Sequence, residues 1–189
     1  MWKTIGFVST IALQCVGIVA VAAQAEPLRI TISYDPNVTA EQPAPVQIDA
    51  AQHYCLNEAI YWEGRNQEID GMVAIGNTIL NRVASADFPD TVCGVVHQGP
   101  LDGSPITRHR CQFSYYCDGL SDARPMQNIL EIQAWDWADV IAEGLLAGDI
   151  EDNTDGSTYY HANYVDPFWN DVYAHVATVD DHLFYTHTW

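Results

Sequence analysis

A helical repeat of apolar residues that ends at an acid constrains the fold of this chain more than any other feature. Leu56, Ala59 and Ile60 recur at positions i, i+3 and i+4, which places them on one face of a helix. The repeat predicts a helix from about residue 50 to Glu63. Gly64 follows, and glycine is the residue type that most often ends a helix in a left-handed conformation.

The predicted position of Glu63 favours a protonated side chain near neutral pH. A carboxylate at a helix C-terminus faces the negative end of the helix dipole, and partial burial also disfavours its charge. A carboxylic acid that keeps its proton is suited to general acid catalysis. The alternative is a surface glutamate at a frayed helix end, and spacing alone does not exclude it.

Further periodic segments surround this helix. Apolar residues at helical spacing predict a second helix over 70–83 and a third over 126–147, with Gly148 at its C-terminal stop. Val92–Val96 is short enough to be a strand or a helical turn. The C-terminal part alternates in the manner of strands and predicts segments 158–161, 172–179 and 182–185, the last two joined as a hairpin.

The N-terminal part has the features of an export signal. Residues 1–25 combine Lys3, an apolar core and the small-residue site Ala23-Gln24-Ala25, so they predict a cleaved signal peptide. A retained membrane anchor is less favoured because the apolar stretch is short. Proline-containing residues 26–49 predict an extended linker, and 50–189 predict one catalytic domain.

Four cysteines remain once the signal is removed: Cys55, Cys93, Cys111 and Cys117. In an exported domain this number predicts two disulfides, and three pairings are possible. The alternative use is a zinc site, which the absence of a C-x-x-C pair disfavours. No nucleotide loop, metal spacing or cofactor motif is present, so we expect no metal and no cofactor.

The charge of the chain excludes some classes of partner. The net charge is −18 and no lysine follows Lys3. A strongly acidic surface repels polyanions, so we expect no nucleic-acid binding and no stable membrane association after signal cleavage.

Two segments suit a carbohydrate ligand. Residues 98–124 form a long predicted loop, and Gln112, Phe113 and Ser114 lie between two of its cysteines. Tyr160 and His161 occupy a predicted strand near the C-terminus. Aromatic faces mixed with hydrogen-bonding groups match sugar rings, although the same aromatic residues could simply pack in the core.

An ordered set of segments resembles the SleB/CwlJ-type cell wall hydrolases. The resemblance covers about Cys55 to Tyr185 and lies in the segments Ala59–Arg65, Val73–Val83, Phe88–Val96, Cys111–Gly119, Tyr159–His161, Pro167–Trp169 and His182–Tyr185. It implies an α+β, lysozyme-like, mostly helical domain with a small C-terminal antiparallel sheet. The chain departs from the family pattern at Gly64, where the family usually has Ala, and at Asn66-Gln67, where it usually has Gly-Glu.

The resemblance implies an exported enzyme, secreted or periplasmic, that cleaves peptidoglycan glycan strands. The Glu of the family's Tyr-x-Glu-x-Arg segment is the catalytic acid, which is Glu63 here. Asn81, Gln112, Phe113, Ser114, Tyr160 and His161 are our candidate substrate-binding residues. We expect a monomer.

The expected reaction is cleavage of the β-1,4 bond between N-acetylmuramic acid and N-acetylglucosamine. Glycoside hydrolases normally use a second carboxylate, and none stands out in the sequence. A lytic transglycosylase mechanism, with one Glu as acid and then base, is therefore favoured. The alternatives are a hydrolytic muramidase or glucosaminidase, a non-catalytic glycan-binding envelope protein, and a disulfide-stapled structural protein.

Overall fold

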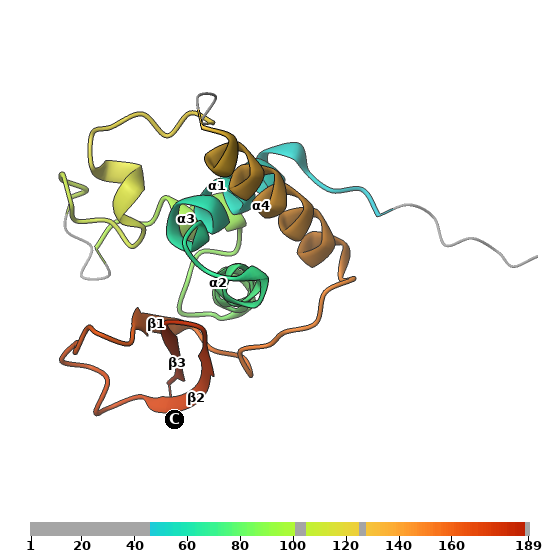
Figure 1. Ribbon diagram of the computed structural model, residues 1–189. Helices are drawn as coiled ribbons and strands as arrows, with labels where there is room; N and C mark the ends of the chain where they lie inside the picture. Colours follow the sequence, from blue (N-terminus) through green and yellow to red (C-terminus); the bar gives the residue numbers. More distant parts are fainter. Residues whose placement is uncertain (1–45, 101–104, 125–127, 188–189) are drawn as a thin grey trace, which may run out of the picture. The chain divides into compact units, whose positions relative to one another are not determined.

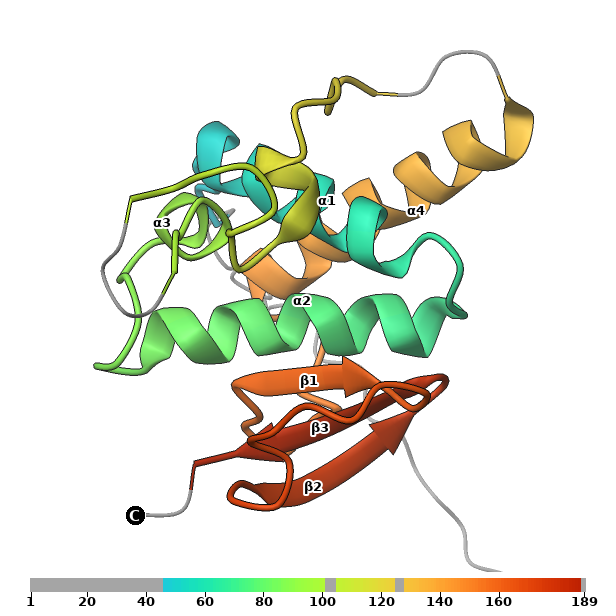
Figure 2. The ribbon, with the colours of Figure 1, turned by 90° about the vertical axis from the view of Figure 1, so that its left-hand side faces the viewer.

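The computed structural model describes residues 46–100, 105–124 and 128–187. The predicted signal peptide and nearly all of the predicted linker lie outside these residues. The described elements are α1 (Ala50–Gly64), α2 (Ile69–Ala84), α3 (Val92–Val96), a 3-10 helix (Ser114–Cys117), α4 (Ile129–Ala147), β1 (Tyr159–Ala162), β2 (Ala174–Val179) and β3 (His182–Thr186). Helices α1, α3 and α4 pack on one side of α2 and the sheet lies on its other side (Figure 1, Figure 2).

Helix α1 occupies the centre of the helical layer. Leu56, Ala59 and Ile60 are fully buried, as their spacing predicts. The burial is not limited to one face, however, because every residue from Cys55 to Tyr61 is buried. Packing against α2, α3 and α4 encloses this helix from several sides. The prediction of a single apolar stripe was therefore incomplete.

The end of α1 differs from the prediction at Gly64. This glycine is the last helical residue, and the chain continues through Arg65 at φ −60°, so no left-handed turn occurs here. Gly64 instead allows a close approach of α1 to α2. A Cβ atom at this position would lie 3.1 Å from Cδ1 of Ile75 and 3.2 Å from Cγ of Met72.

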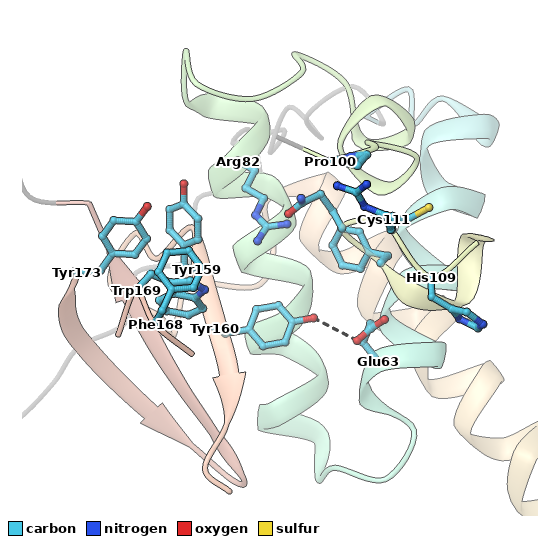
Figure 3. Close-up of a pocket in the computed structure, with 13 residues that line it drawn as sticks. Glu63, Arg82, Pro100, His109, Cys111, Tyr159, Tyr160, Phe168, Trp169 and Tyr173 are labelled. Carbon is cyan, nitrogen blue, oxygen red and sulfur yellow. Dashed lines mark hydrogen bonds between the residues drawn. The ribbon is translucent and has the colours of Figure 1, made fainter. Parts of the chain in front are cut away.

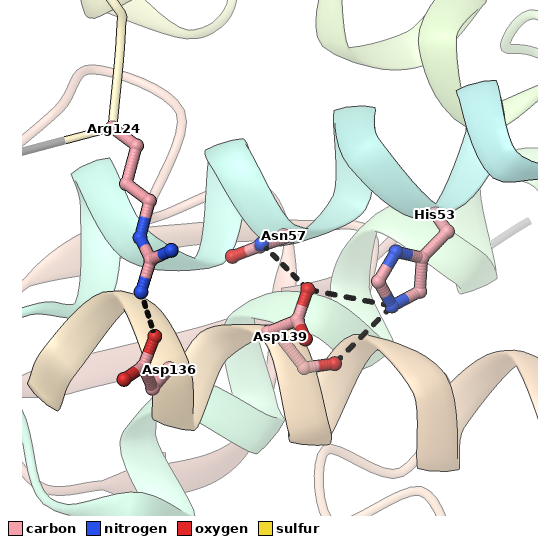
Figure 4. Close-up of polar contacts among 5 residues, drawn as sticks. All are labelled: His53, Asn57, Arg124, Asp136 and Asp139. Atoms are coloured by element: carbon pink, nitrogen blue, oxygen red, sulfur yellow. Dashed lines mark hydrogen bonds and ion pairs between the residues drawn. The ribbon is translucent and has the colours of Figure 1, made fainter. Parts of the chain in front are cut away.

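Polar contacts along one side of α1 tie it to α4 (Figure 4). Asn57 Nδ2 donates to Asp139 Oδ1 at 3.1 Å, and His53 Nε2 lies 3.3 Å from the Asp139 carbonyl oxygen. Arg124, in the segment before α4, pairs with Asp136 of the same helix. Helix α4 ends at Ala147, and the φ of 78° at the capping residue Gly148 confirms the predicted left-handed stop.

The sheet is antiparallel with strand order β1-β3-β2. The predicted hairpin is confirmed: β2 and β3 are joined at Asp180 and Asp181, and Asp180 has a positive φ of 48°. In β1, Tyr160 faces Phe184 of the neighbouring strand. A mostly helical domain with a small C-terminal sheet confirms the predicted α+β class.

The hairpin turn caps α2. The N-cap residue of this helix, Glu68, makes no side-chain capping bond. Asp180 supplies the acceptor instead, because its Oδ2 takes hydrogen bonds from the backbone N–H groups of Glu68 and Gly71, each at 3.1 Å. Unpaired amides of a helix N-terminus are thus satisfied by the sheet.

The four cysteines of the described domain form two disulfides. Cys55 of α1 is bonded to Cys93 of α3, with 5.3 Å between the Cα atoms. Cys111 is bonded to Cys117, with 6.2 Å between the Cα atoms, and closes a short loop. Of the three pairings that the sequence allows, the structure has this one.

Candidate active site

A cavity of about 700 Å³ opens between the end of α1, the loop before the 3-10 helix and the sheet (Figure 3). This volume lies within the range of roughly 300–1,000 Å³ that is usual for ligand pockets. The lining combines charged, polar and aromatic side chains. These are Glu63, Arg82, Pro100, His109, Arg110, Cys111, Gln112, Phe113, Tyr159, Tyr160, Phe168, Trp169 and Tyr173.

Glu63 is partly buried at the end of α1 and faces the cavity. Removal of its carboxyl group from bulk water raises the pKa of Glu63 to about 7. The hydrogen bond from Tyr160 and the charge of Arg82 oppose this rise only in part. The side chain is therefore about half protonated at neutral pH, which suits a group that both gives and takes a proton.

Tyr160 approaches Glu63 from the sheet. Its hydroxyl donates to Glu63 Oε2 over 3.5 Å, a long contact that Figure 3 marks with a dashed line. Burial, aided by the nearby Glu63 charge, keeps the pKa of Tyr160 well above its usual value. The hydroxyl consequently stays protonated and acts as a donor to the carboxylate.

Arg82 lines the cavity between the helices and the sheet. It is only 6% exposed, and its Nε donates to the Thr158 carbonyl oxygen at 2.7 Å. Its guanidinium carbon lies over the rings of Phe88, Phe113 and Tyr159, at 5.2, 5.6 and 5.9 Å from their centroids. These contacts fix a positive charge on the cavity wall near Glu63.

The loop that carries Gln112 and Phe113 is held on both sides. Cys111 is bonded to Cys117, and the backbone N–H of Gln112 donates to the Gln98 carbonyl oxygen at 3.1 Å. Phe113 is 1% exposed, so it anchors the loop in the core while one edge lines the cavity.

Aromatic residues build the sheet side of the cavity. Tyr159, Trp169 and Tyr173 pack on one another with ring centroids 4.5 to 5.7 Å apart. Phe168 lies beside them but is 93% exposed. Figure 3 shows this group across the cavity from Glu63 and His109.

Four of the seven predicted site residues come together in this cavity: Glu63, Gln112, Phe113 and Tyr160. The other three lie elsewhere. Asn81 donates to Asp152 Oδ2 and to the Ser157 carbonyl oxygen, so it orders the segment before β1. Ser114 is exposed at the start of the 3-10 helix. The ring of His161 stacks on Tyr185, with Nε2 3.0 Å from the tyrosine hydroxyl.

The candidate site residues predicted from the sequence did not include Arg82, His109, Trp169 or Tyr173, which also line the cavity. One signal could have identified Arg82. It lies next to the predicted apolar face of its helix, and an arginine that is buried there needs polar or aromatic partners. Alternation along β1 also predicts that His161 and Tyr160 point to opposite faces of the sheet.

Glu63 is the only carboxylic acid among the described residues that line the cavity. Glu58 lies on α1 but is buried with Tyr54 as a hydrogen-bond partner. Asp118 accepts from the backbone N–H of Leu120 and caps a turn.

Two further properties concern only the part of the chain that the structure describes. No group of three or more His, Cys, Asp or Glu side chains is arranged to hold a metal ion. In the same segments, no helix has the length and apolar character needed to cross a membrane.

Curated relatives match part of the chain. A spore cortex-lytic enzyme from Oceanobacillus iheyensis is 40% identical over 57 residues, which are 27% of this chain and 21% of that protein. One from Bacillus subtilis is 34% identical over 86 residues, or 43% of this chain and 25% of that protein. The aligned segments thus span a quarter or less of these relatives.

Solved structures share the fold. The catalytic domain of the germination-specific lytic transglycosylase SleB from Bacillus anthracis has a TM-score of 0.52 and 25% identity, and the match covers 76% of this chain and 100% of that one. The catalytic domain of Bacillus cereus SleB gives a TM-score of 0.51 at 23% identity, over 78% and 99% of the two chains. The predicted lysozyme-like α+β fold is confirmed.

The family comparison covers the greater part of the chain. The model of the family described as "Cell Wall Hydrolase" matches residues 66–185, a range that begins just after Glu63 and includes the loop and sheet walls of the cavity. The predicted resemblance is confirmed, and the chain belongs to the cell wall hydrolase family.

Proposed function

We propose that this protein is an exported lytic transglycosylase that cleaves the β-1,4 bond between N-acetylmuramic acid and N-acetylglucosamine in peptidoglycan. The observation that carries the proposal is the single carboxylic acid, Glu63, among the described residues of the cavity wall. Family membership supports the substrate, and the likeness to the Bacillus anthracis lytic transglycosylase supports the reaction. Action on the cell wall requires export from the cytoplasm.

The chemistry begins with proton transfer from Glu63 to the glycosidic oxygen. The bond from C1 of the muramic acid to that oxygen breaks, and an oxocarbenium-like centre develops at C1. The Glu63 carboxylate then takes the proton of the muramic acid 6-hydroxyl as its oxygen bonds to C1. The products are a 1,6-anhydro end and a free 4-hydroxyl, no water is consumed, and Glu63 is again protonated.

The pKa of Glu63, raised to about 7 by burial, supports this double role. An acid with an ordinary pKa near 4.5 would rarely hold its proton at neutral pH, whereas one near 10 would be a poor proton donor. Tyr160 holds one carboxylate oxygen, so the other oxygen is left to face the substrate.

A hydrolytic mechanism has less support. Inverting and retaining hydrolases place a second carboxyl group roughly 5 to 9.5 Å from the acid, to activate water or to attack C1. Glu58, on the same helix, and Asp118, in the disulfide loop region, do not line the cavity, so neither supplies this second group.

The remaining cavity residues have proposed binding roles. The polar side chain of Gln112 and the ring of Tyr160 suit the polar edges and apolar faces of N-acetylated sugars, and Phe113, which is 1% exposed, anchors the loop that carries Gln112. Asn81 and His161 act indirectly, because Asn81 orders the segment that leads to β1 and His161 packs on the strand beside it.

Mass spectrometry of fragments released from purified sacculi tests the proposal. We expect muropeptides with 1,6-anhydro ends, and none from Glu63→Gln. Glu58→Gln is the matched control, because this acid lies on the same helix outside the cavity, and it should release the same products as the wild type. Reducing ends would support the hydrolase instead, and sacculus binding without release would support the glycan-binding protein.

A further inference from the structure

Phe168 stands at the mouth of the cavity in an unusual state for a large apolar side chain. It lines the cavity, yet 93% of it is exposed. Its neighbours Trp169 and Tyr173 are partly buried and packed on Tyr159. The aromatic side of the cavity therefore continues from the partly buried rings to the solvent-exposed ring of Phe168.

The backbone holds Phe168 in this exposed position. The N–H of Asn170 donates to the Pro167 carbonyl oxygen at 3.1 Å, which makes 167–170 a β-turn with Phe168 and Trp169 at its centre. The side chain of Asn170 also donates to Asp166 Oδ1 at 2.7 Å. The turn thus points Trp169 into the aromatic group and leaves Phe168 outside.

The loop that carries this turn is tied to the hairpin where it leaves β1 and is closed by a further bond after the turn. The backbone N–H of Asn163 donates to the Asp181 carbonyl oxygen at 2.7 Å, and the backbone N–H of Tyr173 donates to the Trp169 carbonyl oxygen at 3.2 Å. Because the backbone of this loop is already ordered, a ligand that covers the Phe168 ring does not have to order the loop on binding. Such preorganisation distinguishes a binding platform from a merely exposed residue.

From this geometry we infer that Phe168 is a stacking platform for a sugar ring of the glycan strand, outside the disaccharide whose bond is cleaved. The inference rests on the proposed function and extends it to substrate length. The cavity itself is of a size for a small oligosaccharide, and Phe168 continues its aromatic wall at the mouth. The C–H face of a pyranose is the apolar surface that such a ring covers. The protein therefore prefers long strands over short fragments.

Tyr164 provides a matched control. It lies in the same loop and is 84% exposed, but it is not among the residues that line the cavity. If surface aromatic residues promoted adhesion to sacculi in general, substitution of either Phe168 or Tyr164 would weaken binding. If the platform belongs to the cleft, only substitution of Phe168 weakens it.

Sedimentation with purified sacculi, in the Glu63→Gln background, measures binding without bond cleavage. Adding Phe168→Ala should raise the dissociation constant roughly tenfold, the loss of about one anchoring aromatic contact. Tyr164→Ala should leave it unchanged, and Phe168→Trp should keep the affinity because it retains an aromatic face. Unchanged binding by Phe168→Ala, or an equal loss in Tyr164→Ala, would overturn the inference.

Oligosaccharide length provides a second measurement. Binding of N-acetylglucosamine oligomers, followed by tryptophan fluorescence, should strengthen from disaccharide to longer chains, and Phe168→Ala should remove this gain. An equal gain in both proteins would also overturn the inference. Because these measurements do not require cleavage, an inactive wild-type enzyme would count against the proposed function alone.

Discussion

The hydroxyl of Tyr160 lies 3.5 Å from Oε2 of Glu63, so a strand residue contacts the side chain at the end of the first helix. The two positions are 97 residues apart. Because this hydrogen bond lowers the pKa of Glu63, the protonation state of the proposed acid depends on the position of the sheet relative to the helices.

Activity should fall as the pH rises through about 7. Burial raises the pKa of Glu63 to this value, and the acid must hold its proton to begin the reaction. The rate kcat/KM on solubilised glycan strands should show an alkaline limb near pH 7. A limb near 4.5, the ordinary value for Glu, would contradict the assignment of Glu63 as a buried acid.

The same pKa predicts that Glu63→Gln stabilises the protein at alkaline pH. A raised folded-state pKa favours folding below the unfolded value of 4.5, and this contribution is lost as the pH rises through about 7. At pH 8 the ionised carboxylate costs up to about 2 kcal/mol, after allowance for water in the open cavity. Thermal melts should therefore show a gain in Tm for Glu63→Gln at pH 8 and no gain at pH 4.

Replacing Tyr160 with Phe should move the alkaline limb to higher pH. The Tyr160 hydrogen bond lowers the pKa of Glu63, so its loss lets that pKa rise further. Loss of one positioning bond of about 1 kcal/mol should also lower kcat/KM roughly fivefold. Tyr185→Phe is the control, because its hydroxyl contacts His161 instead of Glu63, and its pH profile should match the wild type.

Removing the carboxylate of Asp180 should destabilise the domain by about 1 kcal/mol, which is typical of a lost N-terminal helix cap. Asp180→Ala leaves the N–H groups of Glu68 and Gly71 without their acceptor, whereas Asp180→Asn retains an acceptor oxygen. Denaturant unfolding should rank the three proteins as wild type, Asp180→Asn and Asp180→Ala. Equal midpoints for all three would mean that water satisfies the helix end equally well.

The two disulfides should differ in what their removal affects. Cys55 and Cys93 are 38 residues apart, and loop-closure entropy predicts a loss of about 4 kcal/mol for the double Ser variant. Cys111 and Cys117 are 6 apart, for which the same estimate is about 2 kcal/mol. Only the second pair closes the loop of Gln112 and Phe113, so its removal should raise KM more. Measuring Tm and KM for both double variants tests this separation.

Local periodicity accounts for the part of the fold that the sequence predicts well. The predicted helices over 50–63 and 70–83 are observed as Ala50–Gly64 and Ile69–Ala84. Gly64 was wrong as a left-handed stop because the tight packing of α1 on α2 requires a glycine within the helix. That requirement comes from the partner helix and cannot be seen in the local sequence.

The cavity was predicted less completely because its walls come from distant segments. Glu63, Gln112 and Tyr160 were identified from residue type and family resemblance, and the fold brings them together. Arg82 was missed because a cation within a helical repeat gives no indication of which rings will cover it. Phe168 was missed because its proposed role depends on the exposure of its ring beside the cavity. That exposure is set by the position of the 167–170 turn in the folded domain.

The position of Arg82 has a consequence for when the proposed cleavage becomes possible. Its guanidinium lies over three rings, Phe88 after α2, Phe113 in the disulfide loop and Tyr159 in β1. Phe113 and Tyr159 are distant from Arg82 in sequence, and loops must close before contacts between distant segments can stabilise the fold. A chain that is only partly folded therefore has an acid but no cleft around it, and the proposed cleavage requires the completed domain.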